Sequence, residues 1–241
     1  MLDQLNIEEV LFIDIETVPM VPAYNQLSAE WQKLWGDKMK NSVSESQSAE
    51  ALYEKAGIYA EFGRIIVISA GYLTMKNREW HYRVKSFYDD DEKELLTSFS
   101  EALAKFSAAG KKRLCAHNGQ EFDYPYIARR MLVHNISLPP VLNIAGSKPW
   151  EVKEMLIDTL QLWKFGDFKH YTSLSLLCML FGIPTPKDDI DGSQVAKVYY
   201  EERDLDRIIR YCEKDTLAVA NLLLRYKGME ILQPSNMHVI A

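Results

Sequence analysis

The chain has 241 residues, of which 47% are hydrophobic and 26% are charged, and its formal net charge is −6. This composition is typical of a globular protein of one to two domains. The acidic total excludes a strongly basic protein that coats nucleic acid through its phosphates. It does not exclude carboxylates that hold cations, because such groups count as negative until the metal binds.

The three cysteines, Cys115, Cys178 and Cys212, follow no metal-binding or disulfide spacing, and we expect them to be reduced, buried thiols. The amino terminus contains no basic region followed by an apolar core. No later segment has roughly 18 uninterrupted apolar residues, the length that a membrane-spanning helix needs. We therefore expect a cytoplasmic protein that does not bind membranes.

The amino-terminal half predicts three strands, with a helical insertion after the first. Residues 10–15 (VLFIDI) form a short apolar run that ends in acidic residues, which is typical of a buried strand. Residues 27–60 are polar with helical spacing and predict an insertion rather than a domain. Residues 64–73 and 79–87 predict two further strands, joined by a turn at 75–78. These three strands suggest an antiparallel meander.

The carboxyl-terminal half alternates helices with short strands. A helical pattern at residues 91–108 precedes brief apolar strands at 113–116 and 155–158. Further helices are expected at residues 122–134, 172–181 and 205–227. A meander followed by short strands and helices predicts an α/β fold of the ribonuclease-H type, with a mixed sheet of five to six strands and helices on both faces. No repeat or linker divides the chain, so residues 1–241 are expected to form one domain.

A pair of carboxylates lies at the end of the first predicted strand. Asp14 and Glu16 are two residues apart, so their side chains leave the same face of the strand. Two carboxylates so placed repel each other unless a cation lies between them. Oxygen ligands of this kind favour Mg²⁺ or Mn²⁺. The same DxE pattern also occurs at solvated strand ends, so this pair alone does not establish a metal site.

Two other motifs carry carboxylates. Asp123 opens a predicted helix shortly after a turn that contains Asn118, a place where an acid also stabilises the helix dipole. Tyr211 and Asp215 are four residues apart on the last helix, so the phenol and the carboxylate share one face. Each motif alone has an ordinary structural explanation. The argument for a site depends on all three occurring in one chain in this order.

The three motifs, as they stand, are FIDIETVP (residues 12–19), HNGQEFDYPYI (117–127) and YCEKDTLAVANLLLR (211–225). With them the chain resembles the DEDD superfamily of 3′→5′ exonucleases over about residues 10–226. The resemblance is to the tyrosine subgroup, and within it to stand-alone relatives of the proofreading domain of family B DNA polymerases. The histidine subgroup has a histidine five residues before the last acid, where this chain has Arg210.

The resemblance implies a site with two divalent metal ions, Mg²⁺ or Mn²⁺. Asp14 would bridge both ions, Glu16 and Asp215 would complete one of the two sites, and Asp123 would act mainly through bound water. Tyr211 would orient the attacking water, and Glu16 would help to position or deprotonate it. Two ions about 3.5–4 Å apart can clamp a scissile phosphate.

The resemblance also implies where the substrate lies. Thr17 and Val18 would lie against the terminal nucleotide. Asn118 and Phe122 are placed to contact the last bases or the sugar, although Phe122 is almost as well explained by core packing. The expected substrate is the 3′ end of single-stranded DNA, with RNA less favoured, and the products would be nucleoside 5′-monophosphates. A polymerase or repair protein could act with the chain in trans.

Two alternatives remain open from the sequence. The chain could be a catalytically idle nucleic-acid-binding module with the same fold, although all four acids and the tyrosine are present. It could also be an ordinary α/β protein in which the motifs coincide by chance and Asp14 and Glu16 serve another metal-dependent hydrolysis. The choice between DNA and RNA, the pathway, the oligomeric state and the role of the 27–60 insertion stay undecided.

Overall fold

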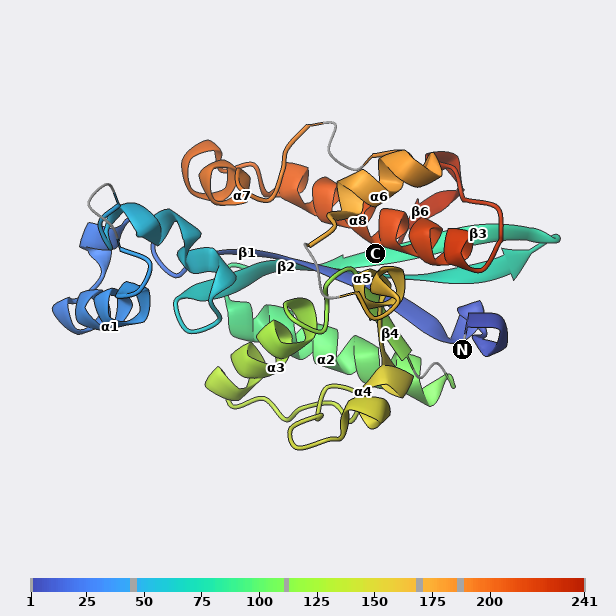
Figure 1. Ribbon diagram of the computed structural model, residues 1–241, viewed down its shortest axis with the longest axis horizontal. Helices are drawn as coiled ribbons and strands as arrows, with labels where there is room; N and C mark the ends of the chain where they lie inside the picture. Colours follow the sequence, from blue (N-terminus) through green and yellow to red (C-terminus); the bar gives the residue numbers. More distant parts are fainter. Residues whose placement is uncertain (1, 44–46, 111–112, 168–170, 186–188, 241) are drawn as a thin grey trace.

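The fold is built on a mixed six-stranded sheet with the strand order β5-β4-β1-β2-β3-β6 (Figure 1). The computed structural model describes residues 2–43, 47–110, 113–167, 171–185 and 189–240. β1 pairs antiparallel with β2, and β2 antiparallel with β3, while β1–β4, β4–β5 and β3–β6 are parallel pairs. The predicted mixed sheet is therefore confirmed. The strands are β1 Val10–Pro19, β2 Gly63–Lys76, β3 Glu79–Phe87, β4 Arg113–Ala116, β5 Leu156–Asp158 and β6 Met237–Val239.

The antiparallel meander contains the longest strands of the sheet. β2 and β3 meet in a two-residue turn, in which Asn77 and Arg78 have φ angles of 55° and 66°. Two positive φ angles are what a tight hairpin turn needs, because that backbone twist matches the twist of the flanking strands. The turn expected at 75–78 is thus shorter than predicted. β1 is also longer than predicted, since pairing with β2 continues as far as Pro19.

Helices cover both faces of the sheet, as expected (Figure 1). One face carries α2 (Glu92–Ala108), α3 (Asp123–Val133) and α4 (Pro149–Met155), and the other carries α6 (Leu174–Phe181) and α8 (Leu205–Tyr226). Successive residues of a strand point to opposite faces. Accordingly, Ile13 and Ile15 lie in the apolar cluster with α2 and α3, whereas Phe12 lies in the cluster with α8. No helix of the described part of the chain is long and apolar enough to cross a membrane.

The insertion expected at residues 27–60 is helical and has an apolar cluster of its own. It contains α1 (Ala29–Met39) and a 3₁₀ helix (Ala51–Ile58), and residues 44–46 lie outside the described residues. Trp35 is fully buried at its centre and donates a hydrogen bond to the Ala49 carbonyl at 2.7 Å. Figure 1 shows the insertion at the end of the β1–β2 pair, next to the last residues of β1.

The remaining predicted elements are confirmed within a few residues, and several short elements were missed. The missed elements are each three to seven residues long, too short to carry a clear periodic pattern. They are α4, α5 (Thr159–Lys164), α7 (Val195–Lys197), the π-helical turn Val198–Glu202 that follows it, and β6. The three cysteines are free and buried, as predicted.

Candidate active site

The site starts from the middle of β1, where the sheet presents Asp14 and Glu16 to the α8 side. Ile13 and Ile15 point into the cluster with α2 and α3. Asp14 and Glu16 alternate with them along the strand and therefore point to the opposite face. The pairing between β1 and β2 shifts register just after Glu16. Such irregularities bend a strand and re-aim its side chains, and they are common beside active sites.

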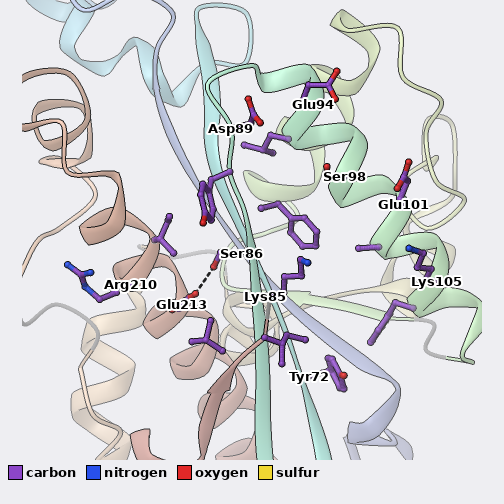
Figure 2. Close-up of a pocket in the computed structure, with 18 of the residues that line it drawn as sticks. Tyr72, Lys85, Ser86, Asp89, Glu94, Ser98, Glu101, Lys105, Arg210 and Glu213 are labelled. Carbon is purple, nitrogen blue, oxygen red and sulfur yellow. Dashed lines mark hydrogen bonds between the residues drawn. The ribbon is translucent and has the colours of Figure 1, made fainter.

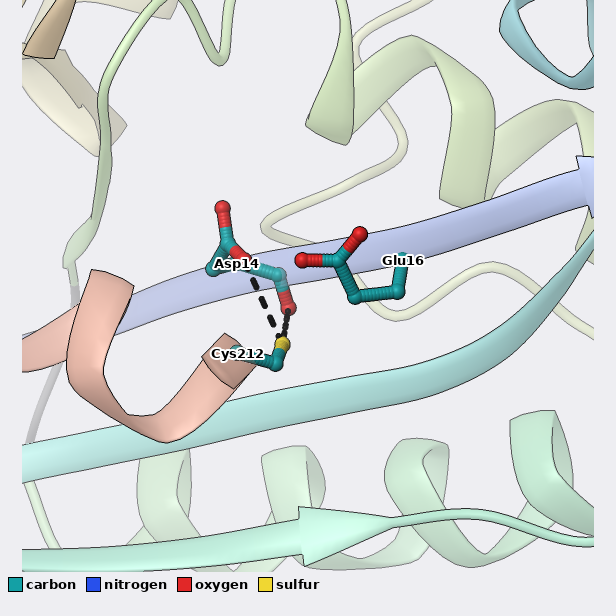
Figure 3. Close-up of side chains that lie close together, drawn as sticks. All are labelled: Asp14, Glu16 and Cys212. Atoms are coloured by element: carbon teal, nitrogen blue, oxygen red, sulfur yellow. Dashed lines mark hydrogen bonds between the residues drawn. The ribbon is translucent and has the colours of Figure 1, made fainter. Parts of the chain in front are cut away.

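α8 supplies the second group of residues. Tyr211 and Asp215 are buried, lie one helical turn apart, and are hydrogen-bonded to each other through their side chains. Between them in the sequence, the Cys212 thiol donates to Asp14, with its Sγ 3.3 Å from Oδ2 and 3.4 Å from the backbone oxygen (Figure 3). Ligand atoms of Asp14, Glu16 and Cys212 all lie within 4.8 Å of one another.

Asp123 reaches the same place from the first turn of α3. Its carboxylate is buried and accepts a hydrogen bond from the backbone N–H of Ile15, the residue between the two acids of β1. The negative charge of Asp215 also contributes to raising the pKa of Asp123. Three separate segments of the chain, those that carry the three sequence motifs, therefore bring four carboxylates together.

The loop that leads to Asp123 is held by a buried acid, Asp158, at the end of β5. Its carboxylate accepts hydrogen bonds from the backbone N–H groups of Asn118 at 2.9 Å and Gln120 at 3.1 Å. It also accepts from Leu160 at 2.9 Å, which makes it the N-cap of α5. Asp158 thus fixes the turn between β4 and α3, which places the first turn of α3 against β1.

The electrostatics of the site follow from burying like charges together. The pKa of Asp14 is well above its usual range, first because of burial and then because of the charges of Asp215, Glu16 and Asp123. Burial likewise raises the pKa of Asp123 to about 7. The pKa of Tyr211 is also raised, by burial and by the neighbouring carboxylates, so its phenol stays protonated and can donate a hydrogen bond.

The predicted substrate residues have different surroundings. Thr17 is partly exposed, and its side chain is hydrogen-bonded to Tyr126. Val18 is fully buried among apolar side chains, so its contact with a nucleotide stays a prediction that packing does not favour. Asn118 has a φ of 63°, and its buried Oδ1 has no hydrogen-bond partner among the described residues. Phe122 is partly buried, with its ring centroid 5.4 Å from that of Tyr126.

Sequence reasoning gave no role to two residues of this site. Cys212 was interpreted as a buried thiol, and a single cysteine in an apolar helix gives no further signal. Asp158 lies at the end of a short strand just before a helix, and this N-cap position was the available clue. Its partners in the β4–α3 loop, however, are about 40 residues away in the sequence.

The donor set fits a divalent metal ion. Glu16, Asp123 and Asp215 are buried, and they and Asp14 supply oxygen atoms, the ligands that Mg²⁺ and Mn²⁺ prefer. Burial raises the pKa of Asp14 and of Asp123, and the charges of neighbouring carboxylates raise both further. A bound cation would remove the repulsion that causes part of these shifts.

Comparison with known proteins gives a family for most of the chain. Residues 58–235, more than half of the chain, match a family described as predicted 3′-5′ exonucleases related to the exonuclease domain of PolB. Asp14 and Glu16 lie before the matched segment, whereas Asp123, Tyr211 and Asp215 lie within it.

A similar fold occurs in the family B DNA polymerase of the hyperthermophilic archaeon Pyrobaculum calidifontis, with a TM-score of 0.56 and 15% sequence identity. The similarity covers 90% of this chain but 24% of the polymerase chain. It confirms the ribonuclease-H-like α/β fold. The match over residues 58–235 shows the family: the chain belongs to the predicted 3′-5′ exonucleases related to the exonuclease domain of PolB.

Proposed function

We propose that this protein is a metal-dependent 3′→5′ exonuclease that hydrolyses phosphodiester bonds at the 3′ end of single-stranded nucleic acid. One observation carries the proposal: four carboxylates from β1, α3 and α8 converge so closely that three of them raise the pKa of the fourth, Asp14. Buried carboxylates this close destabilise the fold by repelling one another, and a bound cation would neutralise that repulsion. The family match supports the same activity.

In this proposal the four acids Asp14, Glu16, Asp123 and Asp215 hold two divalent ions, Mg²⁺ or Mn²⁺. When bound, the ions would supply charge neutralisation for the phosphate and activation of water. Tyr211 is the group that orients the attacking water, because its protonated hydroxyl lies beside Asp215 and can donate or accept a hydrogen bond. Under this proposal the chain is a member of the tyrosine subgroup of the DEDD exonucleases.

The substrate is proposed to be the 3′ end of single-stranded DNA, with RNA second, and the products nucleoside 5′-monophosphates. The relationship to the exonuclease domain of a DNA polymerase supports DNA. The buried Oδ1 of Asn118 has no hydrogen-bond partner in the part of the chain that the structure describes, which supports a role for this residue in accepting a hydrogen bond from the terminal nucleotide. A polymerase or repair protein acting in trans is a further expectation.

The test is a cleavage assay on 5′-labelled single-stranded DNA and RNA oligonucleotides with Mg²⁺, Mn²⁺ or EDTA. The expected result is a ladder that shortens from the 3′ end with metal and not with EDTA. Asp14→Ala should lose at least about 10³-fold in rate, because it removes a ligand and leaves the other acids without their shared cation.

Asp37→Ala is the control, because Asp37 lies on α1 in the helical insertion and not among the four acids. Binding of the oligonucleotide without any cleavage, in a folded wild-type protein supplied with either metal, would contradict the proposal. It would point instead to an idle nucleic-acid-binding module.

A further inference from the structure

A line of polar groups crosses the α8-facing side of the sheet beside Asp14, starting at Ser69, the β2 residue that pairs with Asp14. Ser69 on β2 and Ser86 on β3 are directly paired, and their Oγ atoms are 2.9 Å apart. Ser86 also donates a hydrogen bond to Glu213 on α8, at 2.8 Å (Figure 2). Ser69 is fully buried between Ile68 and Ala70 in the apolar middle of β2, where a hydroxyl is costly unless it forms hydrogen bonds.

The other end of this line reaches the acid cluster. Ser69 is within hydrogen-bonding reach of the Cys212 thiol. Cys212 in turn donates to Asp14, whose Oδ2 is 3.3 Å from the sulfur (Figure 3). The chain of contacts therefore leads from Glu213 through the two serines and the thiol to the catalytic carboxylate.

The direction of these hydrogen bonds can be assigned from the groups themselves. Ser86 gives its hydrogen to Glu213, so the bond between the two serines uses the hydrogen of Ser69. The thiol hydrogen of Cys212 is left for Asp14, whose carboxylate and backbone carbonyl contact the sulfur. A backbone carbonyl can only accept. These assignments use the hydrogens of Ser86, Ser69 and Cys212 once each, so the contact between Ser69 and the Cys212 sulfur is a packing contact without a hydrogen of its own.

We propose that Cys212 is a positioning residue, which packs against Ser69 of the hydrogen-bonded Ser69–Ser86–Glu213 line and whose thiol fixes the orientation of the Asp14 carboxylate for metal binding. The inference rests on the proposed function, because it concerns the same carboxylate. Groups that hydrogen-bond to metal ligands orient them, and removing such a group typically costs about 10–100-fold in metal affinity.

Ser86, next to the far end of the line, is suited to an experiment because it is only partly buried. Ser86 and Glu213 line a groove of about 1390 Å³ between α2 and α8, which Figure 2 shows along the exposed part of β3. Ser86→Ala therefore removes one hydroxyl at a solvent-filled groove. It leaves the four acids and the tyrosine of the site unchanged.

The experiment measures Mn²⁺ binding directly, by electron paramagnetic resonance of the free ion, on the intact chain without nucleic acid. Cys212→Ala is expected to weaken Mn²⁺ binding by about tenfold. Cys212→Ser keeps a hydrogen-bond donor and should retain most of the affinity. Ser86→Ala should weaken binding in the same direction and by less. Cys115→Ala, a buried cysteine on β4, is the matched control and should bind Mn²⁺ as the wild type does.

The outcomes separate this inference from the proposed function. A wild-type protein that binds no Mn²⁺ and cleaves nothing would refute both. A wild type that binds and cleaves, with Cys212→Ala and Ser86→Ala unchanged in Mn²⁺ affinity, would refute the positioning role alone. If Cys212→Ala does not fold, as judged by its thermal unfolding, Ser86→Ala and Cys212→Ser decide the question. In that case an unchanged Ser86→Ala, or a Cys212→Ser variant that binds as weakly as an Asp14→Ala variant, overturns the inference.

Discussion

At the scale of single residues, Tyr211 is the side chain whose substitution can distinguish an effect on catalysis from an effect on metal binding. Its hydroxyl is hydrogen-bonded to Asp215 and lies near the charges of Glu16 and Asp14, which raise its pKa further beyond the effect of burial. A phenol held in this way remains a hydrogen-bond donor across the physiological pH range. It is therefore suited to orient a water molecule rather than to exchange protons with the solvent.

Tyr211→Phe tests this division of roles. We expect the turnover number on single-stranded DNA to fall by about 10²-fold or more, since a positioned polar group contributes on that scale. Mn²⁺ affinity should change little, because all four carboxylates remain. Tyr226→Phe removes a hydroxyl from the other end of the same helix, where it bonds the Thr159 carbonyl, and should cleave normally. A Tyr211→Phe variant with wild-type turnover would show that the phenol is dispensable.

At the scale of secondary-structure elements, Asp158 connects two segments that the sequence keeps apart. It caps α5 and at the same time holds the β4–α3 loop through backbone N–H groups. Because the loop ends in Asp123, an error in its position would move one of the four acids. Asp158 therefore serves the candidate site by holding the loop that leads to Asp123.

Asp158→Ala should destabilise the fold by about 2–4 kcal/mol, since it removes an N-cap and leaves buried N–H groups without an acceptor. Asp91→Ala is the matched control, because Asp91 caps α2 from an exposed position and accepts from Lys93 at 2.8 Å. That variant should lose only about 1 kcal/mol. Urea unfolding measures both, and equal losses would mean that the loop contacts of Asp158 carry no stability.

The helices and strands also show how much of this fold can be predicted from the sequence. The long periodic segments, such as α2 and α8, and the apolar strand β4 were predicted almost residue by residue, because local pattern and tertiary packing agree there. β6 and the short helices were missed, since few residues carry their pattern and their partners are distant. The acids of the site were found through motif order, whereas Cys212 depends on a contact across 198 residues of sequence.

At the scale of the whole molecule, the acid cluster links stability to pH and to metal. Burial is the main reason that the pKa of Asp14 is raised and that the pKa of Asp123 is raised to about 7. A carboxyl whose pKa is higher in the folded protein favours folding when it is protonated. The contribution of Asp123 is thus fully present below its unfolded value near 3.8 and is lost as the pH rises through about 7.

The metal-free protein should therefore melt at a lower temperature at pH 8 than at pH 5.5, and Mg²⁺ or Mn²⁺ should restore the loss at pH 8. Asp123→Asn keeps the shape of the side chain and removes its charge. It should raise metal-free stability at pH 8 by about 2 kcal/mol, or roughly 4–8 °C in Tm, and abolish most cleavage. Differential scanning calorimetry at both pH values, with EDTA or metal, measures these shifts. At pH 8, the result against this account would be that metal does not raise the Tm of the wild type and that Asp123→Asn melts no higher than the metal-free wild type. The four acids would then not repel one another enough to need a cation.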